Sequence, residues 1–199
     1  MSALGSQGPD FQQAANLTDE SDARLAAAVL RKDRKATAEF VSRFADGIYA
    51  YVHSRLVPRR DLVDDLVQEV FLAAWENLEQ YRGTSPLQAW LMGIARHKVE
   101  DHYRARLRAP GAIDDLDGDS EVLASFPDFE SLLEQEQVRK NTWRVMSGLP
   151  EQYRLALIWR YWEKASARDM AAKTGKTEKA IERLLARARA EFRERWNHG

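Results

Sequence analysis

Apolar residues recur at steps of three and four positions along most of this chain, and that period predicts helices. The clearest run is residues 61–79, where Leu62, Leu66 and Val70 form one row and a second apolar row lies beside it. Asp61 stands where an N-cap is expected. The opposite face, left for solvent or a partner, carries Asp65, Gln68, Glu69 and Leu72.

The same period continues on both sides of this run and predicts an all-α fold. Further helices are expected at residues 22–31, 35–44, 46–57, 87–107, 130–148 and 151–162. We expect two small helical domains, at residues 18–108 and 130–199. Residues 1–17, rich in Gly, Ser, Gln and Pro, are expected to form a disordered tail. Residues 109–129 combine helix breakers with an acidic run and are expected to be a flexible acidic linker.

Residues 166–196 carry the pattern of a helix-turn-helix. A short helix at residues 167–174 is followed by Gly175, which accepts a tight turn, and by Thr177, a good N-cap for a helix at residues 178–196. Ile181 and Leu184 are spaced to hold the second helix against the first. If this motif binds DNA, we expect the side chains near the start of this helix to reach base edges and those beside them to reach phosphates. The first group is Thr177, Glu178, Lys179 and Arg183, and the second is Lys176 and Arg187.

Composition narrows the class of protein. The 199 residues have a net charge of −1, which argues against a general polyanion binder, although the charges are segregated along the chain. There are no cysteines, so disulfides and thiolate zinc sites are excluded, and a reducing cytosol is compatible with the sequence. The sequence contains no run of about 18 apolar residues, so no transmembrane helix is predicted. The N-terminus lacks the pattern of a signal peptide.

Two stretches resemble a known family. The run Asp64-Asp65-Leu66-Val67-Gln68-Glu69-Val70-Phe71-Leu72-Ala73-Ala74-Trp75, with Arg82-Gly83-Thr84-Ser85 and the segment that follows as far as Arg106, resembles domain 2 of the bacterial sigma-70 family. The likeness is to its small extracytoplasmic-function (ECF) members. Residues 149–196 resemble domain 4 of the same family, on Leu149-Pro150, Arg154, Leu157, Arg160, Tyr161 and Glu163.

The resemblance implies a transcription initiation factor that binds core RNA polymerase and directs it to promoters by reading minus-10 and minus-35 DNA and melting the duplex. Polymerase binding, to the clamp helices, would fall to Asp61, Asp65, Gln68, Glu69 and Leu72. Minus-10 DNA would be held by Arg82, Gly83, Thr84, Ser85, Arg96, His97, Lys98, Arg104 and Arg106. Minus-35 DNA would be read by Lys176, Thr177, Glu178, Lys179, Arg183 and Arg187, with domain 4 on the flap of a large polymerase subunit.

The resemblance also implies an anti-sigma protein as a partner and a bacterial cytoplasmic location. The residues themselves form no nucleophile–base pair, phosphate loop or metal constellation and no long apolar run, so we expect no catalytic residue, no cofactor and no membrane insertion. This sequence departs from the family pattern in three places. Asp169-Met170-Ala171 stands where an acidic E-I-A is usual, residues 178–183 replace a Gly-Thr-Val-Lys-Ser-Arg run, and His97 replaces a common Asn. The bases that are read therefore do not carry over from the family.

The sequence also raises four other interpretations. A conventional helix-turn-helix regulator would bind duplex DNA without polymerase, and a protein-interaction bundle would not depend on DNA. An enzyme built on Asp64 and Asp65 fails on geometry, because adjacent helical residues point about 100° apart. His97 and His102 have a spacing that suits a metal, but no further ligands are arranged around them.

Overall fold

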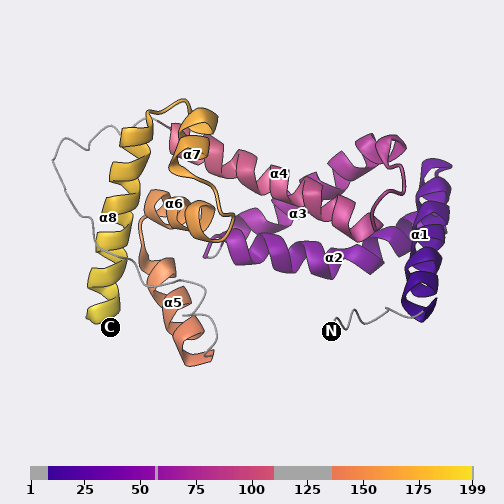
Figure 1. The fold of residues 1–199 in the computed structure, drawn as a ribbon, viewed down its shortest axis with the longest axis horizontal. Helices are drawn as coiled ribbons and strands as arrows, with labels where there is room; N and C mark the ends of the chain where they lie inside the picture. Colours follow the sequence, from indigo (N-terminus) through magenta and orange to yellow (C-terminus); the bar gives the residue numbers. More distant parts are fainter. Residues whose placement is uncertain (1–8, 57, 110–135, 199) are drawn as a thin grey trace, which may run out of the picture. The chain divides into compact units, whose positions relative to one another are not determined.

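The computed structural model describes residues 9–56, 58–109 and 136–198, and within these ranges the protein is built of helices without a β-strand (Figure 1). The all-α prediction is therefore confirmed. The helices are α1 (Pro9–Leu30), α2 (Arg34–Leu56), α3 (Asp61–Asn77) with the short η1 (Leu78–Gln80), α4 (Leu87–Arg108), α5 (Glu136–Gly148), α6 (Glu151–Tyr161), α7 (Ala167–Thr174) and α8 (Glu178–Asn197).

The chain divides into two compact units, Met1–Lys98 and Val99–Gly199. In the first unit, α2 and α3 pack along the rows predicted from the sequence. The rings of Phe40 and Phe71 meet edge to face with centroids 6.0 Å apart, and Phe44 lies 5.4 Å from Phe40. Val63 and Val70 are fully buried. Edge-to-face aromatic contacts add to the stabilisation that burial already gives, so this unit has an ordinary apolar core.

In the second unit, α6, α7 and α8 enclose a core around Trp159, which is almost fully buried. Ile181 and Leu184 of α8 are fully buried, as their spacing predicts. The last ten residues of α4 belong to this unit, and the Tyr103 ring lies 6.0 Å from Trp159. Our expected boundary for the first domain was residue 108, whereas the division between compact units falls at Lys98, inside α4.

Helix α4 buries one side chain in every four: Leu87, Leu91, Ala95, Val99, Tyr103 and Leu107. The first three belong to the first unit and the last three to the second. Each step of four residues turns about 40° round a helix, so neighbours in this row share a face while the whole row winds round α4. The basic residues of α4 stand at positions between those of the row.

Several element boundaries differ from those expected. Helix α1 begins at Pro9, so residues 9–17 are helical; Pro is well suited to a first helical position, and the Gln and Ala that follow are good helix formers. Helix α2 is continuous where two runs were expected, because a single Gly47 costs a packed helix only about 1 kcal/mol. The expected linker, apart from residue 109, and residues 130–135 lie outside the described residues.

The N-cap expected at Asp61 is wrong. Arg60 precedes the first helical residue and already has helical dihedral angles, φ −61° and ψ −30°, without a side-chain cap. Asp61 is the first residue of α3, and its carboxylate lies 2.7 Å from Nη2 of Arg59. An acidic residue there still favours the helix through the dipole of its N-terminus.

Candidate nucleic-acid interface

The helix-turn-helix is fixed by hydrogen bonds at each of its corners. Ser166 and Asp169 form a capping box: the Asp169 backbone N–H donates to Oγ of Ser166 at 3.0 Å, and the Ser166 N–H donates to the Asp169 carboxylate at 3.2 Å. Gly175 has a φ of 72° and donates its N–H to Ala171 O at 2.9 Å, which ends α7. Thr177 caps α8, with Ala180 N donating to its Oγ1 at 3.2 Å.

The capping box also changes the pKa of the Asp169 carboxyl group. The side-chain hydrogen bond from Ser166, followed by the backbone hydrogen bond from the same residue, lowers the pKa of Asp169 below its ordinary value. The ionised carboxylate is thus the form that the folded helix-turn-helix prefers.

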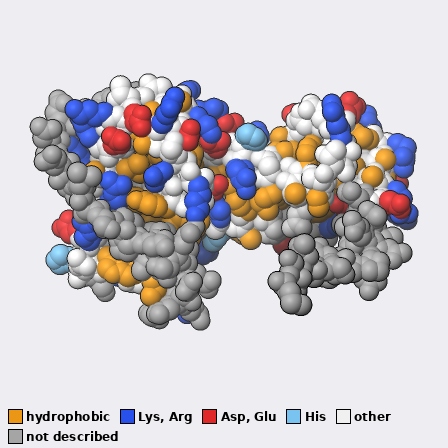
Figure 2. All heavy atoms as spheres, viewed as in Figure 1, with side chains coloured by type: hydrophobic (Ala, Val, Ile, Leu, Met, Phe, Trp, Pro, Cys, Tyr) orange, Lys and Arg blue, Asp and Glu red, His pale blue; other side chains and the backbone are white. Residues whose placement is uncertain are grey.

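Helix α8 separates its apolar and polar sides. Ile181 and Leu184 are fully buried, whereas Glu178 and Lys179 are exposed and Arg183 is half-buried. Of the other expected minus-35 residues, Thr177 is exposed, and Lys176 and Arg187 are half-buried. On the face drawn in Figure 2, Lys and Arg side chains are spread over the C-terminal helices. The arrangement gives a cationic surface at the start of a well-anchored helix, which suits insertion into a DNA groove.

The loop at residues 81–86 is closed by its own contacts. The hydroxyl of Tyr81 donates to Ser85 O at 2.7 Å, and the Tyr81 ring lies 5.6 Å from the ring of Trp90. Gly83 has a φ of 67°, in the left-handed region. Arg82 and Thr84 are exposed, while Gly83 and Ser85 are half-buried. Trp90 is half-buried against Tyr81, so its ring supports the loop.

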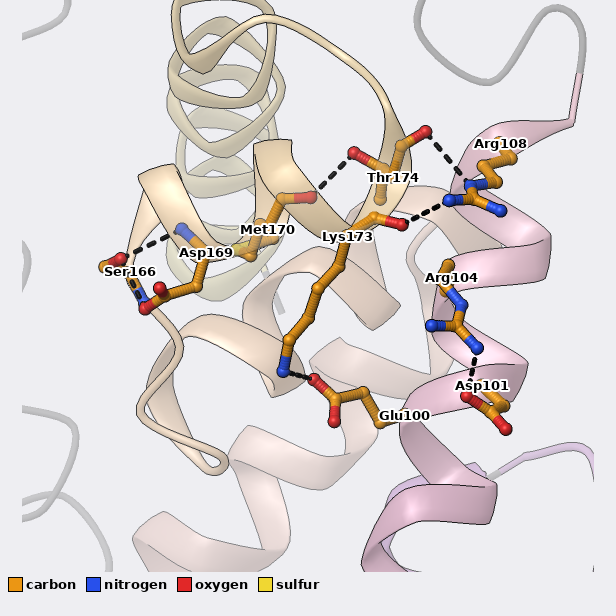
Figure 3. A network of polar contacts seen from close by, with 9 residues as sticks. All are labelled: Glu100, Asp101, Arg104, Arg108, Ser166, Asp169, Met170, Lys173 and Thr174. Carbon is orange, nitrogen blue, oxygen red and sulfur yellow. Dashed lines mark hydrogen bonds and ion pairs between the residues drawn. The ribbon is translucent and has the colours of Figure 1, made fainter.

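The basic residues of α4 differ in what they contact. Arg96 and His97 are exposed. Lys98 pairs with Glu69 of α3 at 3.3 Å, and Nε of Arg106 lies 3.8 Å from Glu151 of α6. Arg104 pairs with Asp101 of its own helix (Figure 3). In this conformation, Lys98, Arg104 and Arg106 already have acidic partners, which a phosphate would have to replace.

Arg108 is a cation whose position was not predicted from the sequence. It donates to Lys173 O at 2.7 Å and to Thr174 O at 3.2 Å, the last two residues of α7 (Figure 3). The side chain of Lys173 in turn pairs with Glu100 of α4. A cation beside the carbonyls at a helix C-terminus is favoured by their partial charge. These contacts attach the end of α4 to the helix-turn-helix within the second unit.

All five residues expected to bind polymerase lie on the exposed side of the 61–79 run. Asp61, Asp65, Gln68 and Glu69 are exposed, and Leu72 keeps 54% of its surface in solvent. Trp75, which lies on the second apolar row of this run, is also 38% exposed. It lines a groove of about 680 Å³ together with Leu30, Lys32, Arg34 and Leu78. Helix α3 therefore presents a surface with acidic and apolar parts.

The described residues contain no cluster of three or more His, Cys, Asp or Glu side chains able to hold a metal ion. Among the helices of the described ranges, none combines the length and apolar character needed to cross a membrane.

Within the described residues, fold and site together define a helical protein with a helix-turn-helix in its second compact unit and a further helical unit before it. The family model for sigma-70 region 2 matches residues 40–109, and the model for sigma-70 region 4 matches residues 139–192. The ECF RNA polymerase sigma-E factor of Escherichia coli K12 is 30% identical over 158 residues, covering 76% of this chain and 82% of that protein. The RNA polymerase sigma-H factor of Pseudomonas aeruginosa is 30% identical over 161 residues, covering 78% and 83%.

Solved structures include CnrH in complex with the cytosolic domain of CnrY, at 25% identity and a TM-score of 0.40, covering 87% of this chain and 95% of that one. The chain belongs to the sigma-70 family, in its ECF group. It is a sigma factor that binds core RNA polymerase and directs transcription initiation at specific promoters. Sigma factors in general are not enzymes.

Proposed function

We propose that promoter selection is divided between two DNA elements, each of which is recognised by residues of one matched region. Residues 18–108 act as domain 2, which binds polymerase and opens the minus-10 element, and residues 130–199 act as domain 4, which reads the minus-35 element. Residues 109–129 are the linker, and residues 9–17, which were expected in a tail, belong to α1. The observation that carries this division is the pairing of a capped helix-turn-helix with an exposed face on α3 in one chain.

The polymerase-binding surface is the exposed side of α3. Asp65, Glu69 and Leu72 follow one another at steps of four and three, so they share a side of the helix, with Asp61 and Gln68 beside them. We assign this side to the clamp helices of polymerase, and the flap of the other large subunit to domain 4. An acidic and apolar surface suits a basic partner that also buries apolar area.

Minus-10 DNA is assigned to the closed loop and the basic residues of α4. Melting requires a pocket for a base that leaves the stack and cations for the strand backbone. Arg82, Gly83, Thr84 and Ser85 would line the pocket, since Tyr81 and Trp90 hold this loop in shape. The strand would be held by Arg96, His97, Lys98, Arg104 and Arg106.

Minus-35 DNA is assigned to the N-terminal half of α8. Thr177, Glu178, Lys179 and Arg183 would face base edges, and Lys176 and Arg187 would face phosphates. The burial of Ile181 and Leu184 on the other side of the helix supports this orientation.

The chain itself would catalyse no reaction and would act in the bacterial cytoplasm, where polymerase and DNA are. We also assign it an anti-sigma partner. The exposed Leu72 and Trp75 support this, because large apolar side chains gathered on one surface are more often covered by a partner than left in water.

The test is assembly with purified bacterial core polymerase, followed by run-off transcription from a promoter library. Stable assembly and initiation at one pair of spaced elements is the expected result. Tight binding to duplex DNA without polymerase, together with failure to bind core, would instead indicate a conventional helix-turn-helix regulator.

A further inference from the structure

Asp22 is a buried carboxylate in the first unit. Its surface is 1% exposed, and it lies on the buried row of α1 with Leu25 and Val29. Burial of an ionised carboxylate is costly unless charged or hydrogen-bonding groups compensate it. An acidic residue on an apolar row therefore needs specific partners.

Those partners come from two other helices. The backbone N–H of Leu87, the first residue of α4, donates to Oδ2 of Asp22 at 2.8 Å. Nη2 of Arg43, on α2, lies 2.8 Å from Oδ1 in an ion pair, although Oδ1 accepts no well-directed hydrogen bond among the described residues. The first N–H groups of a helix have no partner within that helix, and negative charge is favoured beside them. Asp22 thus caps α4 from α1.

The capped position is also the point where the 81–86 loop ends. Pro86 O accepts from the N–H groups of Ala89 and Trp90, at 2.9 and 3.2 Å, so the loop runs directly into the first turn of α4. At its other end, Tyr81 follows η1 and binds Ser85 through its hydroxyl. The loop is therefore closed upon itself, and its orientation depends on how the first turn of α4 is held.

We propose that Asp22 is a positioning residue for minus-10 recognition. By capping α4 and pairing with Arg43, its carboxylate fixes the first turn of α4, and with it the loop that receives the unstacked base. Asp22 itself is buried and touches no DNA. The inference rests on the proposed function of residues 82–85 and adds to it the group that holds them in place.

The test uses the full chain assembled with core polymerase, on single-stranded DNA carrying the minus-10 element found by the promoter library. The measured quantity is the ratio of affinities for that element and for the same strand with its unstacked base replaced. Asp22→Ala is expected to lower this ratio by about fivefold to tenfold, the scale of one lost helix cap. Asp22→Asn keeps an oxygen acceptor for Leu87 N but loses the charge, so its ratio should lie between those of the wild type and of Asp22→Ala.

The matched control is Asp33→Ala. Asp33 accepts from Lys35 N at 2.8 Å and from Ala36 N at 3.1 Å, so it caps α2 and not α4. This variant loses a capping carboxylate of the same first unit and should keep the wild-type ratio. A purely structural role for Asp22 would lower only the folded fraction, which cancels in a ratio of affinities, and would leave the ratio at its wild-type value in both variants.

The outcomes distinguish the positioning role of Asp22 from the proposed function of residues 82–85. A wild-type ratio in folded Asp22→Asn and Asp22→Ala would overturn the positioning role, as would an equal loss in Asp33→Ala. If Asp22→Ala does not fold, a wild-type ratio in Asp22→Asn is enough to overturn it. If Thr84→Ala leaves the ratio of the wild type unchanged, the loop does not read the base, and the proposed function of residues 82–85 fails first.

Discussion

Arg106, near the end of α4, places its Nε atom 3.8 Å from Oε1 of Glu151 at the start of α6. Both side chains are partly exposed, and such pairs contribute about 0–1 kcal/mol. The pair nonetheless engages a cation that we assign to the minus-10 strand. Glu151→Gln is therefore expected to raise the affinity of the holoenzyme for minus-10 single-stranded DNA by up to about fivefold, measured by fluorescence anisotropy at low salt.

The control for this change is Glu191→Gln, which removes the partner of Arg195, 2.7 Å away, and should leave the affinity as it was. A lower affinity in the Glu151→Gln variant would contradict the assignment of Arg106 to the DNA strand.

Arg183→Ala is expected to weaken promoter selection while polymerase binding stays normal. The loss of a good base-edge contact costs about 1–3 kcal/mol, and the preference for the correct base at one minus-35 position should relax with it. Duplex binding and run-off transcription from single-base promoter variants would measure this. Arg189→Ala is the control, because residue 189 lies about 240° further round α8; an intact preference in Arg183→Ala would show that another side of the helix faces DNA.

Charge reversal on α3 should prevent holoenzyme assembly. Asp65→Lys with Glu69→Lys is expected to lower affinity for core polymerase at least tenfold, since like charges placed across an interface cost several kcal/mol. Glu39→Lys with Asp46→Lys changes the charge equally on exposed positions of α2 and should bind core normally. Normal assembly by the α3 variant in a pull-down with core would remove this side of α3 from the interface.

Two glycines should respond to alanine in opposite ways. Gly175 has a φ of 72°, where a Cβ costs about 1–2 kcal/mol even though it would meet no atom within 4 Å. Gly93 lies inside α4, where a Cβ also meets no atom within 4 Å, and alanine there gains about 0.5–1 kcal/mol. Urea unfolding should show Gly175→Ala destabilised and Gly93→Ala stabilised, and equal stability of the two would argue against the left-handed turn.

The Ser166–Asp169 capping box should make stability depend on pH. The pKa of Asp169 is lowered in the folded state relative to an unfolded value of about 3.9, so its contribution is present above about pH 4 and is lost as pH falls through the folded pKa. Asp169→Asn should therefore melt below wild type at pH 7, and the difference should shrink below about pH 4. Asp46→Asn serves as a control for an amide on an exposed helix position; a difference between Asp169→Asn and wild type that is the same at all pH values would contradict the charged cap.

Local signals in the sequence predicted the helix-turn-helix well. Gly175 and Thr177 each act on their immediate neighbours, so the bounds of α7 and the start of α8 agree with the pattern. The cap expected at Asp61 failed because Arg60 is already in a helical conformation, and residue type alone does not set that conformation.

Contacts between residues far apart in the sequence could not be predicted from local sequence patterns. Leu87 N and Asp22 are 65 positions apart, and Lys173 and Glu100 are 73 positions apart, so only tertiary packing brings them together. One signal was available for Asp22, an acidic side chain on the same row as Leu25 and Val29. That pattern predicts a buried partner without saying which.

The cap on α4 also bears on modular engineering of this family. The match to region 2 begins at residue 40, so it includes Arg43 and Leu87 and leaves out Asp22. A chimera joined at the matched boundaries would carry every residue assigned to minus-10 DNA, yet would take its α4 cap from the host chain. Transfer of promoter specificity between relatives therefore requires α1 to be included in the chimera together with region 2.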